Sequence, residues 1–186
     1  KGRPTGSDYI KSVFEDFVEK EKNDEKNISI LGFGKIGSQS TIIISQNFQR
    51  LNKSNNGKIN NEDLKKIFRG IELSKKFELP IIFLVDNKGI DTTFENEISG
   101  IANSLSKCIM NLSNHEQLLI SIITGETTTE GSLPYFISDR VLMLENSIFY
   151  TSTDKENLKN IQMNAKECLE TGLINKIIQE PPLGAS

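Results

Sequence analysis

Residues 117–133 constrain the fold of this chain more than any other stretch. They open with an apolar run at 118–123, interrupted only by Ser121 and rich in β-branched side chains. Such a run predicts a strand buried on both faces, as in a parallel sheet. It is followed by a polar turn with three threonines between Gly125 and Gly131. Because α/β proteins place their functional groups where buried strands end, we expect the site of this chain in that turn.

Similar strands and intervening helices recur along the chain. Apolar runs predict buried strands at 81–85 and 140–144, a β-hairpin at 28–33 and 40–44, and shorter strands at 147–150 and 173–178. Helical spacing of apolar residues predicts helices over 8–18, 61–77, 94–110 and 155–172, and a short helical connection at 133–137. Helix-separated strands after an initial hairpin indicate the α/β class and one domain over residues 1–186.

Charge and composition argue against several classes of partner. The formal net charge is −3 and no basic run is interleaved with aromatic residues, so nucleic-acid binding is not expected. No apolar run reaches the ~20 residues of a membrane-spanning helix, and residues 1–4 lack the apolar segment of a signal peptide. Cys108 and Cys168 stand far apart within helical patterns. We therefore expect buried free thiols and a cytoplasmic protein, without a disulfide or a cysteine-based metal site.

Residues 52–63 imitate a calcium-binding EF-hand loop. Gly57 occupies the sixth position and Asp63 the twelfth, where a bidentate glutamate is usual. The first, third and fifth positions carry neutral oxygens, from Asn52, Ser54 and Asn56. Two interpretations follow: a calcium-binding module, or a solvated loop that caps a helix beginning at residue 60 or 61. The low charge favours the capping loop.

Other short motifs give little support for catalysis by side chains. His115 is the only histidine, and it precedes a strand, at the end opposite to the site of a parallel sheet. We expect it in a surface loop. The chain contains no HExxH, Walker A or GxGxxG pattern, and no metal site is expected.

The glycines of the strand-end turns offer a different chemistry. Backbone N–H groups at such turns can stabilise an oxyanion, and glycine lets the backbone approach a substrate. Gly125 and Gly131 flank the turn after the first strand described, and Gly89 follows the strand at 81–85. The alternative is that these are ordinary turns, and spacing alone does not decide between the two.

Several segments, in the same order over residues 3–184, resemble the carboxyltransferase alpha subunit of bacterial acetyl-CoA carboxylase. Residues 3–10 are similar to the family's RPxxxDYI opening, and residues 77–86 resemble its F-x-x-P-I-I…D strand. Residues 125–144 resemble GEGGSGGAL…DKVxML, and residues 173–181 resemble LIDxIIxEP. The resemblance implies an α/β protein with the crotonase fold, in which ββα units repeat.

The resemblance also implies a function. The family member pairs with a homologous beta-type subunit, and the oligomer moves the carboxyl group from carboxybiotin to acetyl-CoA, forming malonyl-CoA for fatty acid synthesis. Carboxybiotin arrives on a biotin carboxyl carrier protein, so no cofactor is bound covalently. The implied catalytic positions, acting through backbone N–H groups, are Gly89, Thr127, Thr128 and Gly131. The implied positions for binding the cofactor are Gly125 and Ser132.

The segments that carry this site differ from the family's pattern. Thr127, Thr128 and Glu130 stand where the family has glycine, residues 87–91 replace a longer TPGAYPG loop, and residues 45–48 replace H-Q-K-G. β-Branched residues do not readily adopt φ > 0 and would crowd a bound carbonyl group. Loss of one oxyanion donor typically costs ~10²–10³ in rate. Two hypotheses therefore stay open: an active alpha-type subunit, and a catalytically inactive relative that acts as a structural or regulatory partner.

Overall fold

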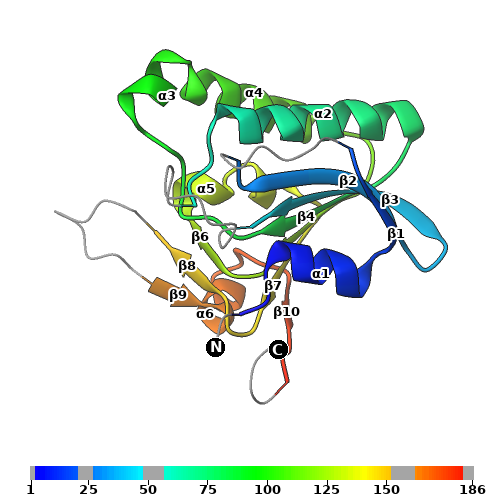
Figure 1. Ribbon diagram of the computed structural model, residues 1–186. Coiled ribbons are helices and arrows are strands. Elements are labelled where there is room, and N and C mark those ends of the chain that lie inside the picture. The colour runs from blue at the N-terminus through cyan, green and yellow to red at the C-terminus, as the bar shows by residue number, and fades with distance from the viewer. Residues whose placement is uncertain (1–2, 21–26, 48–56, 152–161, 182–186) are drawn as a thin grey trace.

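A seven-stranded sheet forms the centre of the molecule (Figure 1). The computed structural model describes residues 3–20, 27–47, 57–151 and 162–181. In order across the sheet the strands are β1 (Glu15–Glu19), β2 (Ser29–Ile36), β3 (Gln39–Gln46), β4 (Ile81–Val85), β5 (Leu119–Ile123), β7 (Arg140–Leu144) and β10 (Lys176–Ile178). Strands β1, β2 and β3 pair antiparallel, whereas β3, β4, β5, β7 and β10 pair parallel. The parallel strands therefore present their carboxyl ends at one edge.

Helices cover both faces of this sheet. On one face lie α2 (Asn61–Phe77) and α4 (Ile101–Ser113), preceded by the short α3 (Phe94–Ile98), and on the other lies α1 (Gly6–Val13), as Figure 1 shows. The larger apolar cluster joins α2 and α4 to the sheet, and a smaller one packs Ile10 and Phe14 against Ile30, Ile43 and Leu84. Burial on both faces explains why the central strands are almost wholly apolar.

A second, smaller sheet continues from the end of β5. It contains β6 (Glu126–Thr128), β8 (Ile148–Tyr150) and β9 (Gln162–Asn164). The connecting elements are the short helices α5 (Thr129–Ser132) and α6 (Ala165–Glu170) and the 3₁₀ turn η1 (Tyr135–Ile137). The predicted helical connection at 133–137 is confirmed by η1, and the turn predicted to hold the site is partly strand and partly helix.

Most of the predicted elements are confirmed, and three helices are not as predicted. The prediction of helix to residue 18 is wrong, because α1 ends at Val13 and residues 15–19 form the edge strand β1. Strand pairing prevails there: Phe17 packs over Gly32, where a methyl group would lie 2.5 Å from the ring. The helix predicted over 94–110 is two helices interrupted at Gly100, and its second part extends to Ser113.

The helix predicted over 155–172 is confirmed only in part. Residues 162–164 form β9 because they pair with β8, and helix α6 begins at Ala165. Residues 155–161 lie outside the described part of the chain. Gly172 follows the end of α6 with φ 76°, as predicted for a C-terminal cap.

The EF-hand-like segment caps a helix. Asn60 is the N-cap of α2, and Asp63 completes a capping box with it. Asp63 is fully buried, and its carboxylate accepts hydrogen bonds from the backbone N–H groups of Ser29 at 2.8 Å and of Asn60 at 3.1 Å. The carboxylate expected at the last calcium position is therefore engaged with the backbone. Residues 52, 54 and 56 lie outside the described ranges.

Both cysteines are buried free thiols, as predicted. Burial raises the pKa of Cys108 to about 12 and, with the nearby Glu167 carboxylate, that of Cys168 to about 11. Since the thiolate is the reactive form, neither cysteine should react with an aromatic disulfide reagent at pH 8 in the folded protein. In denaturant both should react at once. Rapid release of the reagent's chromophore by the native protein would contradict this prediction.

Within the described ranges, no helix combines the length and the apolar composition that crossing a bilayer requires.

Candidate functional site

The two turns predicted to carry the site lie against each other. A methyl group on Gly131 would lie 2.0 Å from Asn87 Oδ1 and 2.9 Å from Gly89 Cα. Only glycine fits at residue 131, because atoms of the other turn occupy the space that a side chain would need. The turn after β4 and the turn after β6 are therefore joined at the carboxyl edge of the sheet.

Backbone hydrogen bonds carry β4 and β5 beyond the ends of the regular strands. Thr124 N–H donates to Val85 O at 2.9 Å, and Asn87 N–H donates to Glu126 O at 2.8 Å. These bonds hold the start of β6 beside the loop that contains Gly89. The positions of both turns thus follow directly from the parallel pairing of the two buried strands.

The N–H groups of the two predicted glycine donors, Gly89 and Gly131, are bonded to oxygen atoms of the protein. Gly89 N–H donates to Asn87 Oδ1 at 2.9 Å, and Gly131 N–H donates to Thr128 Oγ1 at 3.2 Å. Gly89 has φ 95°, a conformation that favours glycine. An acyl oxygen that reaches either donor has to replace an oxygen acceptor that is already present.

The threonines of the second turn adopt ordinary extended backbone. Thr128 has φ −121°, and the only described non-glycine residues with positive φ are Asp16 and Glu78. Thr127 and Thr128 therefore do not adopt the positive φ that β-branched residues avoid. Both lie in β6, where pairing with β8 imposes the extended conformation that suits β-branched residues.

The threonine side chains fill the turn. Thr127 is fully buried, and Thr128 is 3% exposed. Thr129 Oγ1 donates to Thr151 O at 2.7 Å, so this hydroxyl is also engaged. Ser132, one of the two positions implied for cofactor binding, is fully buried and donates to Thr128 O at 2.6 Å.

An ion-pair cluster borders the same turn. Asp86, just after β4, pairs with Arg3, and Arg3 Nη1 lies 3.5 Å from Glu126 Oε1. Burial raises the pKa of Asp86 to about 6, although the Arg3 guanidinium opposes the shift. A methyl group on Gly125 would lie 2.3 Å from Asp86 Oδ1 and 2.6 Å from Arg3 Cζ. Gly125 is thus needed for the close approach of this ion pair.

Arg3, Asp86, Gln46 and Tyr135 were not among the residues predicted for the site. Gln46 is the last residue of β3, and its Nε2 donates to the Tyr135 hydroxyl at 2.5 Å. Two signals could have identified part of this group. Arg3 and Asp86 both belong to segments that resemble the family. In residues 45–48, which replace the family's H-Q-K-G, Gln46 alone keeps the family's residue.

His115 lies elsewhere, before β5, as expected. Its Nε2 is 2.8 Å from Ser74 Oγ, which also bonds to Leu79 O, a carbonyl near the amino end of β4. Burial, with the nearby Lys75, lowers the pKa of His115. The histidine therefore lies by the amino ends of the strands, whereas the joined turns follow carboxyl ends. In the described part of the chain, no group of three or more His, Cys, Asp or Glu residues could hold a metal ion.

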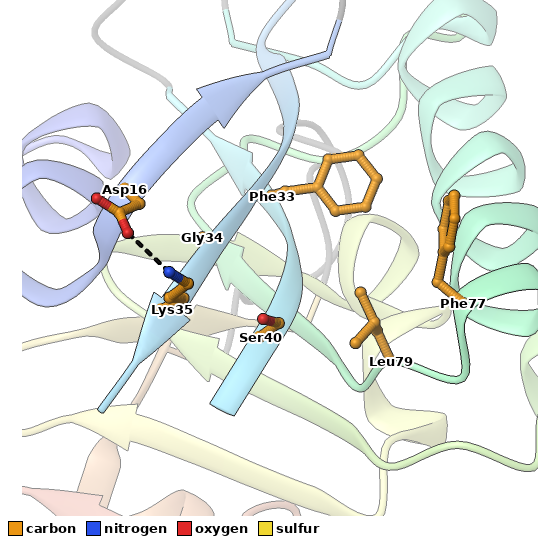
Figure 2. Close-up of a pocket in the computed structure, with 7 residues that line it drawn as sticks. All are labelled: Asp16, Phe33, Gly34, Lys35, Ser40, Phe77 and Leu79. Atoms are coloured by element: carbon orange, nitrogen blue, oxygen red, sulfur yellow. Dashed lines mark hydrogen bonds and ion pairs between the residues drawn. The ribbon is translucent and has the colours of Figure 1, made fainter. Parts of the chain in front are cut away.

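A separate surface pocket of about 400 Å³ lies by the hairpin of β2 and β3 (Figure 2). The rings of Phe33 and Phe77 meet edge to face with centroids 6.0 Å apart, and Lys35 pairs with Asp16 at 2.8 Å. The other lining residues are Gly34, Ser40 and Leu79. Ser40 and Leu79 lie near the amino ends of β3 and β4, whereas the joined turns follow carboxyl ends. No residue predicted for the site lines this pocket.

The sheet, with two glycine turns in contact at its carboxyl edge, matches solved carboxyltransferases, and this match defines the class as the crotonase fold. The solved structure of transcarboxylase 12S superimposes on the chain with a TM-score of 0.79 and 15% identity, covering 92% of this chain and 36% of that one. The family model described as acetyl co-enzyme A carboxylase carboxyltransferase-like matches residues 1–186. The chain belongs to the acetyl-CoA carboxylase carboxyltransferase alpha family.

Two curated relatives illustrate the relationship. The carboxyl transferase subunits beta/alpha of acetyl-coenzyme A carboxylase from Clostridium tetani is 31% identical over 205 residues, covering 99% of this chain and 36% of the relative. The carboxyl transferase subunit alpha from Clostridium beijerinckii is 30% identical over 207 residues, covering 100% of this chain and 76% of the relative. The chain thus corresponds to part of the longer polypeptide in one case and to most of the subunit in the other.

Proposed function

We propose that this chain is the alpha-type carboxyltransferase subunit of a biotin-dependent acetyl-CoA carboxylase. It acts with a beta-type subunit and transfers the carboxyl group of carboxybiotin, on a carrier protein, to acetyl-CoA. The observation that carries the proposal is the contact between the Gly89 and Gly131 turns in a chain that matches the family along its length. Curated relatives whose names contain both beta and alpha support a beta-type partner.

The arrangement of the turns suits the chemistry of this transfer. As the methyl carbon of acetyl-CoA loses a proton, negative charge develops on the thioester oxygen. The carbon then bonds to the carboxyl carbon while the bond from that carbon to the ureido nitrogen of biotin breaks, and the released nitrogen takes up the proton. We place that oxygen at the N–H groups of the joined turns. Gly89 N–H now donates to a neutral amide oxygen at 2.9 Å. Hydrogen bonds to an anionic oxygen are roughly twice as strong, so exchange of acceptors favours the enolate over the ground state.

The remaining site assignments are part of the same proposal. We assign carboxybiotin binding to Gly125, beside the Arg3–Asp86 pair, and to Ser132 of α5, whose hydroxyl has to leave Thr128 O to reach a ligand. We treat residues 1–186 as one domain, supported by the sheet that both apolar clusters share. A reducing cytoplasm is the proposed location, which two free thiols support.

The test is reconstitution of the transfer. The chain is purified with the beta-type subunit from the same genome, and malonyl-CoA is measured with acetyl-CoA and the carboxylated carrier. Turnover that requires both subunits is the expected result. A stable but inert complex that gains turnover when Thr127, Thr128 and Glu130 are replaced by glycine would instead establish the inactive relative. Failure to bind any beta-type subunit would contradict both hypotheses.

A further inference from the structure

A buried network of side-chain amides connects the end of β3 to both glycine turns. Gln46 is 1% exposed and Asn87 is fully buried. Gln46 Oε1 accepts from Asn87 Nδ2 at 2.9 Å and from Asp86 N–H at 3.3 Å, while its Nε2 donates to the Tyr135 hydroxyl. The amide of Gln46 is thus held at both ends, and it fixes the amide of Asn87 in turn.

Asn87 contacts both turns at once. Its Oδ1 accepts from Gly89 N–H at 2.9 Å and from Thr127 Oγ1 at 3.4 Å. Its Nδ2 donates to Gly131 O at 3.3 Å as well as to Gln46. Each half of the amide therefore has two partners, and these partners fix which end is oxygen and which is nitrogen. Networks in which every member is satisfied hold their groups rigidly.

We propose that Asn87 is a positioning residue that sets the separation of the Gly89 and Gly131 turns, with Gln46 and Tyr135 as its supports. This inference rests on the proposed function, because the separation of the turns matters only if it places two N–H donors around one acyl oxygen. Asn87 does not take part in bond making. It acts through the backbone of the two turns. When an acyl oxygen replaces Asn87 Oδ1 on Gly89 N–H, the bonds of Asn87 to Thr127 Oγ1 and Gly131 O still hold the turns together, and a displacement of 1 Å can cost about 100-fold in rate.

A simpler interpretation is that Asn87 only stabilises its own turn. Asparagine side chains often bond to the backbone N–H two residues on, as Asn87 does with Gly89. In that case changes at Asn87 would affect Gly89 alone. The bond from Nδ2 to Gly131 O is the observation that a purely local role does not require.

Two substitutions separate these interpretations through the exchange rates of the Gly89 and Gly131 amide protons, measured by NMR in the full chain. Asn87→Leu removes all the hydrogen bonds of the amide, so both glycine amides should exchange about tenfold faster. Asn87→Asp keeps the acceptor for Gly89 but replaces the donor that faces Gly131 O with an oxygen. It should leave Gly89 slow and accelerate Gly131, whose own N–H bond to Thr128 Oγ1 loosens once Asn87 no longer holds the Gly131 carbonyl. Acceleration confined to Gly89 in the leucine variant would overturn the proposal.

Tyr135→Phe provides a second variant that keeps the ring and its edge-to-face contact with Phe83, at a centroid distance of 5.2 Å. Removing the hydroxyl should speed exchange at both glycines, less than Asn87→Leu does. Unchanged exchange at both would overturn the supporting role of Gln46 and Tyr135. Asn114→Leu, on the exposed end of α4, is the matched control and should leave both amides unchanged.

Activity in the complex with the beta-type subunit gives the second readout. Asn87→Leu should lower kcat for malonyl-CoA formation about 100-fold, with KM for acetyl-CoA changed less than about threefold. A raised KM with unchanged kcat would overturn a positioning role. If the wild-type complex forms no malonyl-CoA, the proposed function fails, whereas the exchange rates still decide whether Asn87 couples the two turns.

Discussion

Replacing Gly131 with alanine is expected to lower carboxyl transfer at least about 100-fold, the effect of losing one oxyanion donor. The added methyl group would lie 2.0 Å from Asn87 Oδ1 and 2.9 Å from Gly89 Cα. One of these contacts is to backbone, so the two turns must move apart. Overpacking of this kind should also lower the free energy of unfolding by about 1–3 kcal/mol. Steady-state kinetics of the complex and urea unfolding of the chain measure the two effects.

Gly37→Ala is the matched control for this change. Gly37 lies in the hairpin between β2 and β3 with φ 56°, and a methyl group there would meet nothing within 4 Å. It should lower stability by about 1 kcal/mol through backbone strain and leave turnover unchanged. Equal turnover of Gly131→Ala and the wild-type protein would show that contact between the two turns is irrelevant to activity.

The second large effect concerns the buried carboxyl of Asp86 and the pH dependence of stability. Its pKa is raised from 3.8 to about 6 on folding, chiefly by burial. The folded protein therefore binds more protons at this group than the unfolded chain does. The stability that the group contributes is fully present below pH 3.8 and is lost as the pH rises through about 6. The shift corresponds to about 3 kcal/mol.

Asp86→Asn removes this titration and keeps the shape of the side chain. The free energy of unfolding of the wild-type protein minus that of Asp86→Asn should fall by about 3 kcal/mol between pH 3.8 and 6 and stay constant above. Urea unfolding at several pH values measures the difference. Asp16→Asn is the control. The exposed Asp16 carboxylate accepts a hydrogen bond from Lys35, which lowers its pKa. The free energy of unfolding of the wild-type protein minus that of Asp16→Asn should therefore rise with pH. A flat difference for Asp86→Asn would contradict the raised pKa.

The sequence predicted the interior of the sheet well because burial on both faces leaves an unmistakable pattern. The apolar run at Ile81–Val85 has no polar member, whereas an amphipathic helix would place polar residues within such a stretch. Edge elements were harder to predict. Phe17 and Val18 stand at helical spacing from Phe14, yet they lie in β1, where Val18 is 64% exposed. Pairing with β2 decided the structure there, and such pairing leaves no local pattern.

The candidate site was located from the sequence, but its contacts were not. Gly89 and Gly131 could be assigned to neighbouring turns because parallel strands end at the same edge. The bonds of Asn87 to Gly131 and of Arg3 to Asp86 join residues 44 and 83 positions apart, and spacing carries no information about them. The conformation of the threonines could not be predicted for a related reason: it is set by pairing with β8, whose partner residues lie 22 positions further along the chain.

The joining of distant segments at the site has a consequence for the order of folding. The hairpin of β2 and β3 pairs residues close in sequence, from Ile36 with Gln39 to Ser29 with Gln46. The Gly89 and Gly131 turns meet only after β4 and β5 have paired, and Arg3 joins them across most of the first half of the chain. Loop-closure entropy delays such contacts. During refolding, amide protons of the hairpin should therefore become protected before those of the two turns, and a nascent chain should form this hairpin before its site.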